Sequence, residues 1–260
     1  MSLRVTMARP GKIIEAEQRS SIQEVDGTLA GRLGRMSLGQ QVITLAIWPL
    51  LEQILSFMVN TVDLILATRM ADGDTRVAVM DALGLGGYAM WLMMILQGAV
   101  ATGVLAIVSR AAGARKPEEA RQGLVQGILA GLFMGVISGL IIRLSLPQII
   151  KIFGLSDAAS EYAFDYLSIL AWSCPFLGIF YACTNALRAI GDTRTPFFIM
   201  LFINMCNMIL SAAFVFLDPP LGGMGIAGLA WGSLLAWLLG TLVVVAVSYT
   251  HLRAHETLLD

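Results

Sequence analysis

Long apolar segments separated by short polar stretches dominate this 260-residue sequence. Each apolar segment is long enough to cross a bilayer, since a helix rises about 1.5 Å per residue and the hydrocarbon core is about 30 Å thick. The pattern therefore predicts an all-α integral membrane protein. Transmembrane helices are expected at 42–68, 77–108, 122–146, 162–187, 196–217 and 226–247.

The first predicted helix carries a polar stripe. On a helical wheel its members fall within an arc of about 80°. A carboxylate facing lipid would cost about 2.5 to 3.5 kcal/mol, so the stripe should face protein or a water-filled cavity. The two carboxylates are candidate ion-binding groups, or else buried acids held by neighbouring amides and hydroxyls, and the proline is a candidate hinge. The stripe consists of Pro49, Glu52, Ser56, Asn60 and Asp63.

Polar residues also line up on two later helices. In the fifth, Asn204, Asn207 and Ser211 lie within an arc of about 60° and could meet the stripe of the first helix or simply join helices. The fourth contains Pro175, a second candidate hinge. Its polar residues are interpreted as structural contacts: Tyr181, Thr184, Asn185 and Arg188.

Glycines recur at every fourth position of the third helix, which leaves one helix face as nearly bare backbone. Such a face lets a neighbouring helix approach closely, so we interpret it as a packing surface. A weaker version of the pattern occurs in the sixth helix. The glycines of the third helix are Gly123, Gly127, Gly131, Gly135 and Gly139, and those of the sixth are Gly228, Gly232 and Gly240.

Composition supports the membrane assignment, because 57% of residues are hydrophobic, 13% are charged and the mean hydropathy is +0.77. A net charge of −1 argues against a nucleic-acid partner. The three cysteines lack metal-ligand spacing, and no catalytic triad or phosphate-binding glycine loop is apparent. We therefore expect neither an enzyme nor a metal site.

Basic residues predict the orientation. With the N-terminus inside, cytoplasmic segments carry eight of the loop arginines and lysines and external loops carry four. The positive-inside rule then places residues 1–39 in the cytoplasm.

Three stretches resemble the multidrug and toxic compound extrusion (MATE) transporters, in consistent order across residues 38–247. A fourth, shorter match, Gly225-Ile-Ala-Gly-Leu-Ala, opens the sixth helix. The three are Pro49-Leu-Leu-Glu-Gln-Ile-Leu continuing to Asp63, the block from Gly103 to Arg115, and Asn185-Ala-Leu-Arg-Ala-Ile-Gly-Asp-Thr-Arg-Thr-Pro196.

The resemblance implies a two-lobe transporter of which residues 40–247 form one six-helix lobe. It also implies an antiporter in the cell inner membrane, coupled to H⁺ or Na⁺ without another cofactor, that exports amphipathic or cationic organic compounds. Asp63 and Asn207 match the family's ion-coupling positions, Ser211 stands where many members have a second aspartate, and Glu52 is a candidate for the missing charge. We expect the substrate cavity to include Gln53, Asn60, Asn204 and Tyr181.

The final segment, 248–260, breaks the apolar pattern and resembles a non-native tail, so we expect the native frame to be lost near Val247 and a second lobe to be missing. The partner would then be that lobe or a second copy of the chain, besides lipid and a small organic substrate. Two alternatives remain open. One is a flippase for lipid-linked sugars, and the other is a non-transporting membrane scaffold.

Overall fold

The computed structural model describes residues 36–257 and is built from helices in this part of the chain. The chain divides into two compact units, and the border between them lies between Ile47 and Trp48. Six segments of the described chain are long and apolar enough to span a membrane, as expected from the sequence. The elements are α2 (Leu38–Met70), α3 (Gly73–Gly113), α4 (Pro117–Phe153), α5 (Asp157–Leu170), η2 (Ala171–Ser173), α6 (Cys174–Ala189), α7 (Arg194–Phe216) and α8 (Gly225–Thr257).

Most of the helices extend beyond their predicted bounds, and capping contacts occur at some of their ends. Before α2, the Ser37 hydroxyl accepts from the Gln40 amide nitrogen, and the Gln40 side chain accepts from the Ser37 amide, which forms a capping box. Helix α4 continues through Pro147, beyond its predicted end at residue 146, and stops before Gly154, which is in the left-handed conformation. Hydropathy marks the membrane-crossing part of a helix and does not fix its ends.

The fourth span, which we predicted as one helix at 162–187 with a hinge at Pro175, is divided into α5, η2 and α6. Pro175 has no N–H to donate to the Ala171 carbonyl four residues earlier, and its ring would crowd that oxygen. The chain instead forms the 3₁₀ turn η2 between α5 and α6, and the Ser173 hydroxyl donates to the Leu170 carbonyl at 2.6 Å. The predicted hinge residue Pro175 thus lies directly after a real interruption of the helix.

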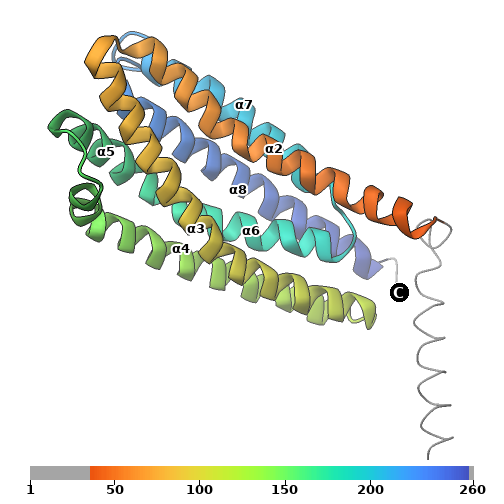
Figure 1. Cartoon of the computed structure of the whole chain (residues 1–260). Coiled ribbons are helices and arrows are strands. Elements are labelled where there is room, and N and C mark those ends of the chain that lie inside the picture. The colour runs from red at the N-terminus through yellow and green to blue at the C-terminus, as the bar shows by residue number, and fades with distance from the viewer. Residues whose placement is uncertain (1–35, 258–260) are drawn as a thin grey trace, which may run out of the picture. The chain divides into compact units, whose positions relative to one another are not determined.

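Helix α4 packs closely on α3 and α6, and Figure 1 shows it beside both. Its glycine face makes this approach possible. A Cβ atom at Gly131 would lie only 2.4 Å from the Gly178 carbonyl oxygen, and one at Gly139 would lie 2.6 Å from that of Ala171. The predicted packing role of the α4 glycines is therefore confirmed.

We expect Gly131→Ala to destabilise the protein by about 1–3 kcal/mol, because backbone atoms of α6 cannot move aside as a side chain can. The measurement is thermal unfolding of the purified protein in lipid nanodiscs. Gly98→Ala on α3 is the control, since a Cβ atom there meets nothing within 4 Å. A normal melting temperature for Gly131→Ala would contradict the backbone contact.

Helix α8 packs along α7, α6 and α5. Its glycines again face a neighbour, and a Cβ at Gly232 would clash with Ser211 of α7. The helix continues without interruption from residue 247 to Thr257, so the segment beginning at residue 248 starts inside a helix. The close approach of α8 to α7 brings Ser233 and Ser211 to the same level as Asp63 of α2.

Candidate functional site

Asp63 is the buried acceptor of a four-donor cluster. Its side chain is 2% exposed. The Ser233 hydroxyl donates to Oδ2 at 2.9 Å, and the Tyr166 hydroxyl reaches the same oxygen at 3.4 Å. Asn207 and Ser211 each donate to Oδ1 at 3.4 Å. Four helices, α2, α5, α7 and α8, thus converge on one carboxylate.

Asn207 is the centre of the polar contacts around this carboxylate. Its amide nitrogen also lies 2.8 Å from the Ser233 hydroxyl and 3.3 Å from that of Ser211. Its Oδ1 atom is buried without a hydrogen-bond partner in the described part of the chain. A carboxylate, an amide oxygen and hydroxyls are hard oxygen ligands, which suit a proton or a small hard cation.

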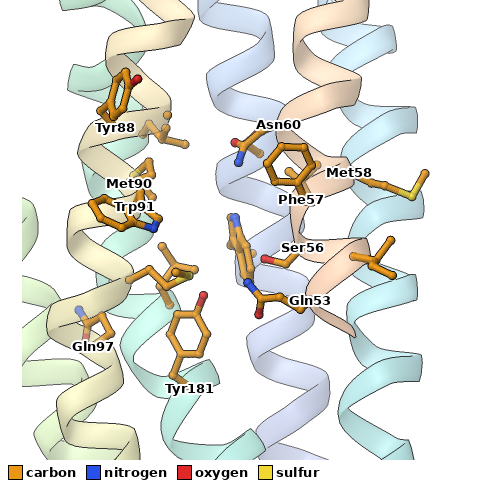
Figure 2. A pocket seen from close by; sticks show the side chains of 18 of the residues that line it. Gln53, Ser56, Phe57, Met58, Asn60, Tyr88, Met90, Trp91, Gln97 and Tyr181 are labelled. Carbon is orange, nitrogen blue, oxygen red and sulfur yellow. The ribbon is translucent and has the colours of Figure 1, made fainter. Parts of the chain in front are cut away.

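An open cavity of about 800 Å³ lies beside the cluster. Figure 2 shows side chains of α3 and α2 facing each other across it, with Trp91 on one wall and Gln53, Ser56 and Asn60 on the other. Its lining is mainly apolar and aromatic, and no Lys or Arg occurs among the described lining residues. The aromatic members are Phe57, Tyr88, Trp91, Tyr166, Tyr181 and Trp237.

The cluster and the cavity share residues. Ser233 and Tyr166, both hydrogen-bonded to Asp63, also line the cavity. Asp63 itself lies behind them, so a change in its charge would act on the cavity wall through these two hydroxyls. The Asp63 cluster and the cavity therefore share the side chains of Ser233 and Tyr166.

Glu52 lies apart from that cluster. Its Oε2 atom accepts from Arg188 Nη2 of α6 at 2.5 Å, and the Glu52 and Arg188 side chains are 8% and 23% exposed. Glu52 therefore does not supply a second carboxylate beside Asp63. Arg188, which we interpreted as a structural residue of the fourth span, is its partner.

The structure brings together most of the predicted site residues. Asp63, Asn207 and Ser211 meet as the helical wheels suggested, and Gln53, Asn60 and Tyr181 line the cavity. Asn204 does not line it, because its amide nitrogen donates to the Met200 carbonyl one turn earlier. Pro49 lies within the continuous helix α2.

Sequence reasoning missed three residues of the site. Ser233 is a single small hydroxyl in an apolar run, and Tyr166 reads as one more aromatic residue of a transmembrane helix. Gln97 is a polar carboxamide within the long apolar helix α3, and this contrast could have identified it from the sequence. All three are less than 5% exposed.

Comparison with known proteins places this sequence in a family. The MatE family model matches residues 49–213. The uncharacterized transporter YisQ of Bacillus subtilis is 20% identical over 201 residues, which cover 77% of this chain and 43% of that protein. The probable multidrug resistance protein NorM of Thermotoga maritima is 24% identical over 171 residues, covering 65% and 37%. The chain thus spans less than half the length of these relatives.

Solved structures share the fold. A MATE crystal structure in a bent conformation aligns with a TM-score of 0.69 at 21% identity, covering 78% of this chain and 43% of that one. An outward-facing multidrug resistance MATE transporter of the MOP superfamily aligns with a TM-score of 0.66 at 22% identity, with the same coverage. The family match covers more than half of the sequence and the six apolar helices agree with it, so the chain belongs to the MatE family and is a multi-pass membrane protein.

Proposed function

We propose that this chain is one lobe of a cation-coupled antiporter that exports amphipathic or cationic organic compounds across the cell inner membrane. The observation that carries the proposal is the pair Ser233 and Tyr166, which contact Asp63 and line the cavity. A proton or Na⁺ on Asp63 changes the charge behind this shared wall. Binding of cargo and ion is thereby coupled, and each disfavours the other.

The coupling follows from the four donors. When Asp63 is ionised, all four donors face a negative charge, and the 2.9 Å hydrogen bond from Ser233 is the strongest of them because the other three are 3.4 Å long. A proton on one oxygen forces at least one donor to turn away, and a bound cation repels all four. In either state, the hydroxyls of Ser233 and Tyr166 become available to rearrange, so the shape and polarity of the cavity wall change.

The lining of the cavity suits an amphipathic or cationic organic compound better than a lipid-linked sugar. A phosphate-bearing lipid would need cationic partners, and none occurs among the described lining residues. Aromatic faces and methionines instead suit planar, apolar and cationic molecules of varied shape. Met90 and Met94 belong to the lining, next to Trp91.

The cavity is open on one side, which supports a second half. Phe57, Tyr88 and Trp91 line it, yet they are 74%, 68% and 58% exposed. We propose that a second six-helix lobe, or a second copy of this chain, closes the cavity over these residues, and that the N-terminus is cytoplasmic.

The test is competition between ion and cargo. The protein in lipid nanodiscs is titrated with the fluorescent cation ethidium at a series of pH values and sodium concentrations. Ethidium affinity should fall as pH falls or sodium rises, and the nanodisc without protein provides the background. In proteoliposomes, ethidium addition should then release protons or sodium. Ethidium affinity that changes with neither pH nor sodium would overturn the proposal. A chain that pairs stably with a second subunit but binds no ethidium would favour a membrane scaffold.

A further inference from the structure

Three polar side chains of α2 line the cavity without a hydrogen-bond partner. Gln53, Ser56 and Asn60 lie on its α2 wall, as Figure 2 shows. Gln53 and Asn60 are exposed and Ser56 is half-buried. None of these side chains makes a hydrogen bond to another residue in the described part of the chain. Their donors and acceptors are therefore open to a molecule that enters the cavity.

The three residues form a polar ladder along one face of α2. Their spacing of three and four positions keeps them within an arc of about 60° on the helix. Gln53 and Asn60 are separated by about 10 Å along the helix axis. The ladder offers two amides and one hydroxyl, which are neutral and can each donate and accept. A matching ligand carries several neutral donors and acceptors spread over a similar length.

The wall opposite the polar ladder is aromatic. Trp91 of α3 lies there in Figure 2, and Tyr88 precedes it by about one turn. Their side chains are 58% and 68% exposed, so ring surface is available for stacking. No Asp, Glu, Lys or Arg occurs among the described lining residues. The lining therefore recognises a ligand by aromatic contact on one side and by neutral hydrogen bonds on the other.

We propose that the cavity selects aromatic compounds with a neutral, hydroxyl-rich substituent, such as aryl glycosides. The aromatic ring packs against Trp91, and the sugar hydroxyls bind the polar ladder. A hexose suits the ladder because each hydroxyl both donates and accepts, as the amides of Gln53 and Asn60 do. It carries no phosphate and so requires no cationic partner. This inference rests on the proposed function and deepens it by naming a class of cargo.

The order of two affinities distinguishes the polar ladder from simple apolar burial. Replacing the sugar by a methyl group makes a ligand more apolar, which favours its transfer from water into an apolar cavity. The same replacement removes the partners of the ladder and leaves its hydrogen bonds unmade. Apolar burial therefore predicts tighter binding of the methyl ether, whereas the polar ladder predicts tighter binding of the glycoside.

The experiment compares 4-methylumbelliferyl β-glucoside with 7-methoxy-4-methylcoumarin, which share one ring system and differ only in the group on the same oxygen. Both are titrated calorimetrically into the full chain in nanodiscs, and empty nanodiscs are subtracted to remove partitioning into lipid. We expect the glucoside to bind about tenfold or more tightly.

Variants of the polar ladder locate the preference. Gln53→Met and Asn60→Leu should each reduce it about threefold or more, and the double variant should bring the ratio to one or below. Both replacements should fold, because the native side chains make no hydrogen bond in the described part of the chain. Gln126→Met on α4, an exposed glutamine outside the cavity, is the matched control and should keep the preference.

The outcomes separate this inference from the proposed function. Equal affinities for the wild-type protein, or tighter binding of the methyl ether, would overturn the role of the polar ladder even if ethidium competes with protons or sodium. A preference that survives the double variant would also overturn it. A preference lost in the double variant and kept in Gln126→Met would support it, even if ethidium binding proved independent of both ions. The wild-type comparison is decisive without any variant.

Discussion

Asp63→Asn is expected to abolish the dependence of ethidium binding on pH and sodium, while ethidium still binds. Asparagine has the size of aspartate but carries no charge to exchange with a proton or cation. The fold should survive, because the hydroxyls of Ser233 and Tyr166, which donate to Oδ2, can turn and accept from an amide nitrogen instead. The ethidium affinity of Asp63→Asn, measured across the same pH and sodium series, should stay constant.

In proteoliposomes the same variant should show proton or sodium release no greater than that of empty vesicles. Asp81→Asn is the matched control, since it makes the same chemical change at an exposed position of α3. It should behave like the wild type in both assays. Full ion dependence in Asp63→Asn would show that the coupling group is elsewhere, and Glu52 would be the next carboxylate to examine.

Much of this site could be predicted from helical periodicity. The wheel of α2 put Asp63 on a polar stripe, and the wheel of α7 put Asn207 and Ser211 on one face. In the structure these two faces meet. Periodicity identifies the polar side of a helix. In a membrane, packing that side against another polar face has a lower free energy than exposing it to lipid.

The remaining contacts depend on helix rotation and height, which one sequence does not reveal. Glu52 shares the stripe of Asp63 but lies about 16 Å away along the helix axis. At that level its neighbour is Arg188, separated from it by 136 residues in the chain. Ser233 reaches Asp63 because Gly232 lets α8 approach Ser211 closely, and this effect of a glycine appears only once the partner helix is known.

The second large effect is expected for Arg188→Met, which should destabilise the protein by about 3–5 kcal/mol. The variant leaves the Glu52 carboxylate buried, at 8% exposed, without the guanidinium that now lies 2.5 Å away. Thermal unfolding in nanodiscs measures the loss. Arg110→Met, at an exposed position near the end of α3, is the control and should have little effect.

The double variant Glu52→Gln with Arg188→Met should recover much of the stability, because no uncompensated charge then remains buried. If the double variant loses as much stability as the two single variants together, Glu52 and Arg188 do not interact. The single variant Glu52→Gln also settles the role of this carboxylate. If Asp63 alone couples ion and cargo, Glu52→Gln keeps the response of ethidium binding to pH and sodium. If Glu52 supplies the second charge of the coupling site, that response is lost although Asp63 and its four donors are intact.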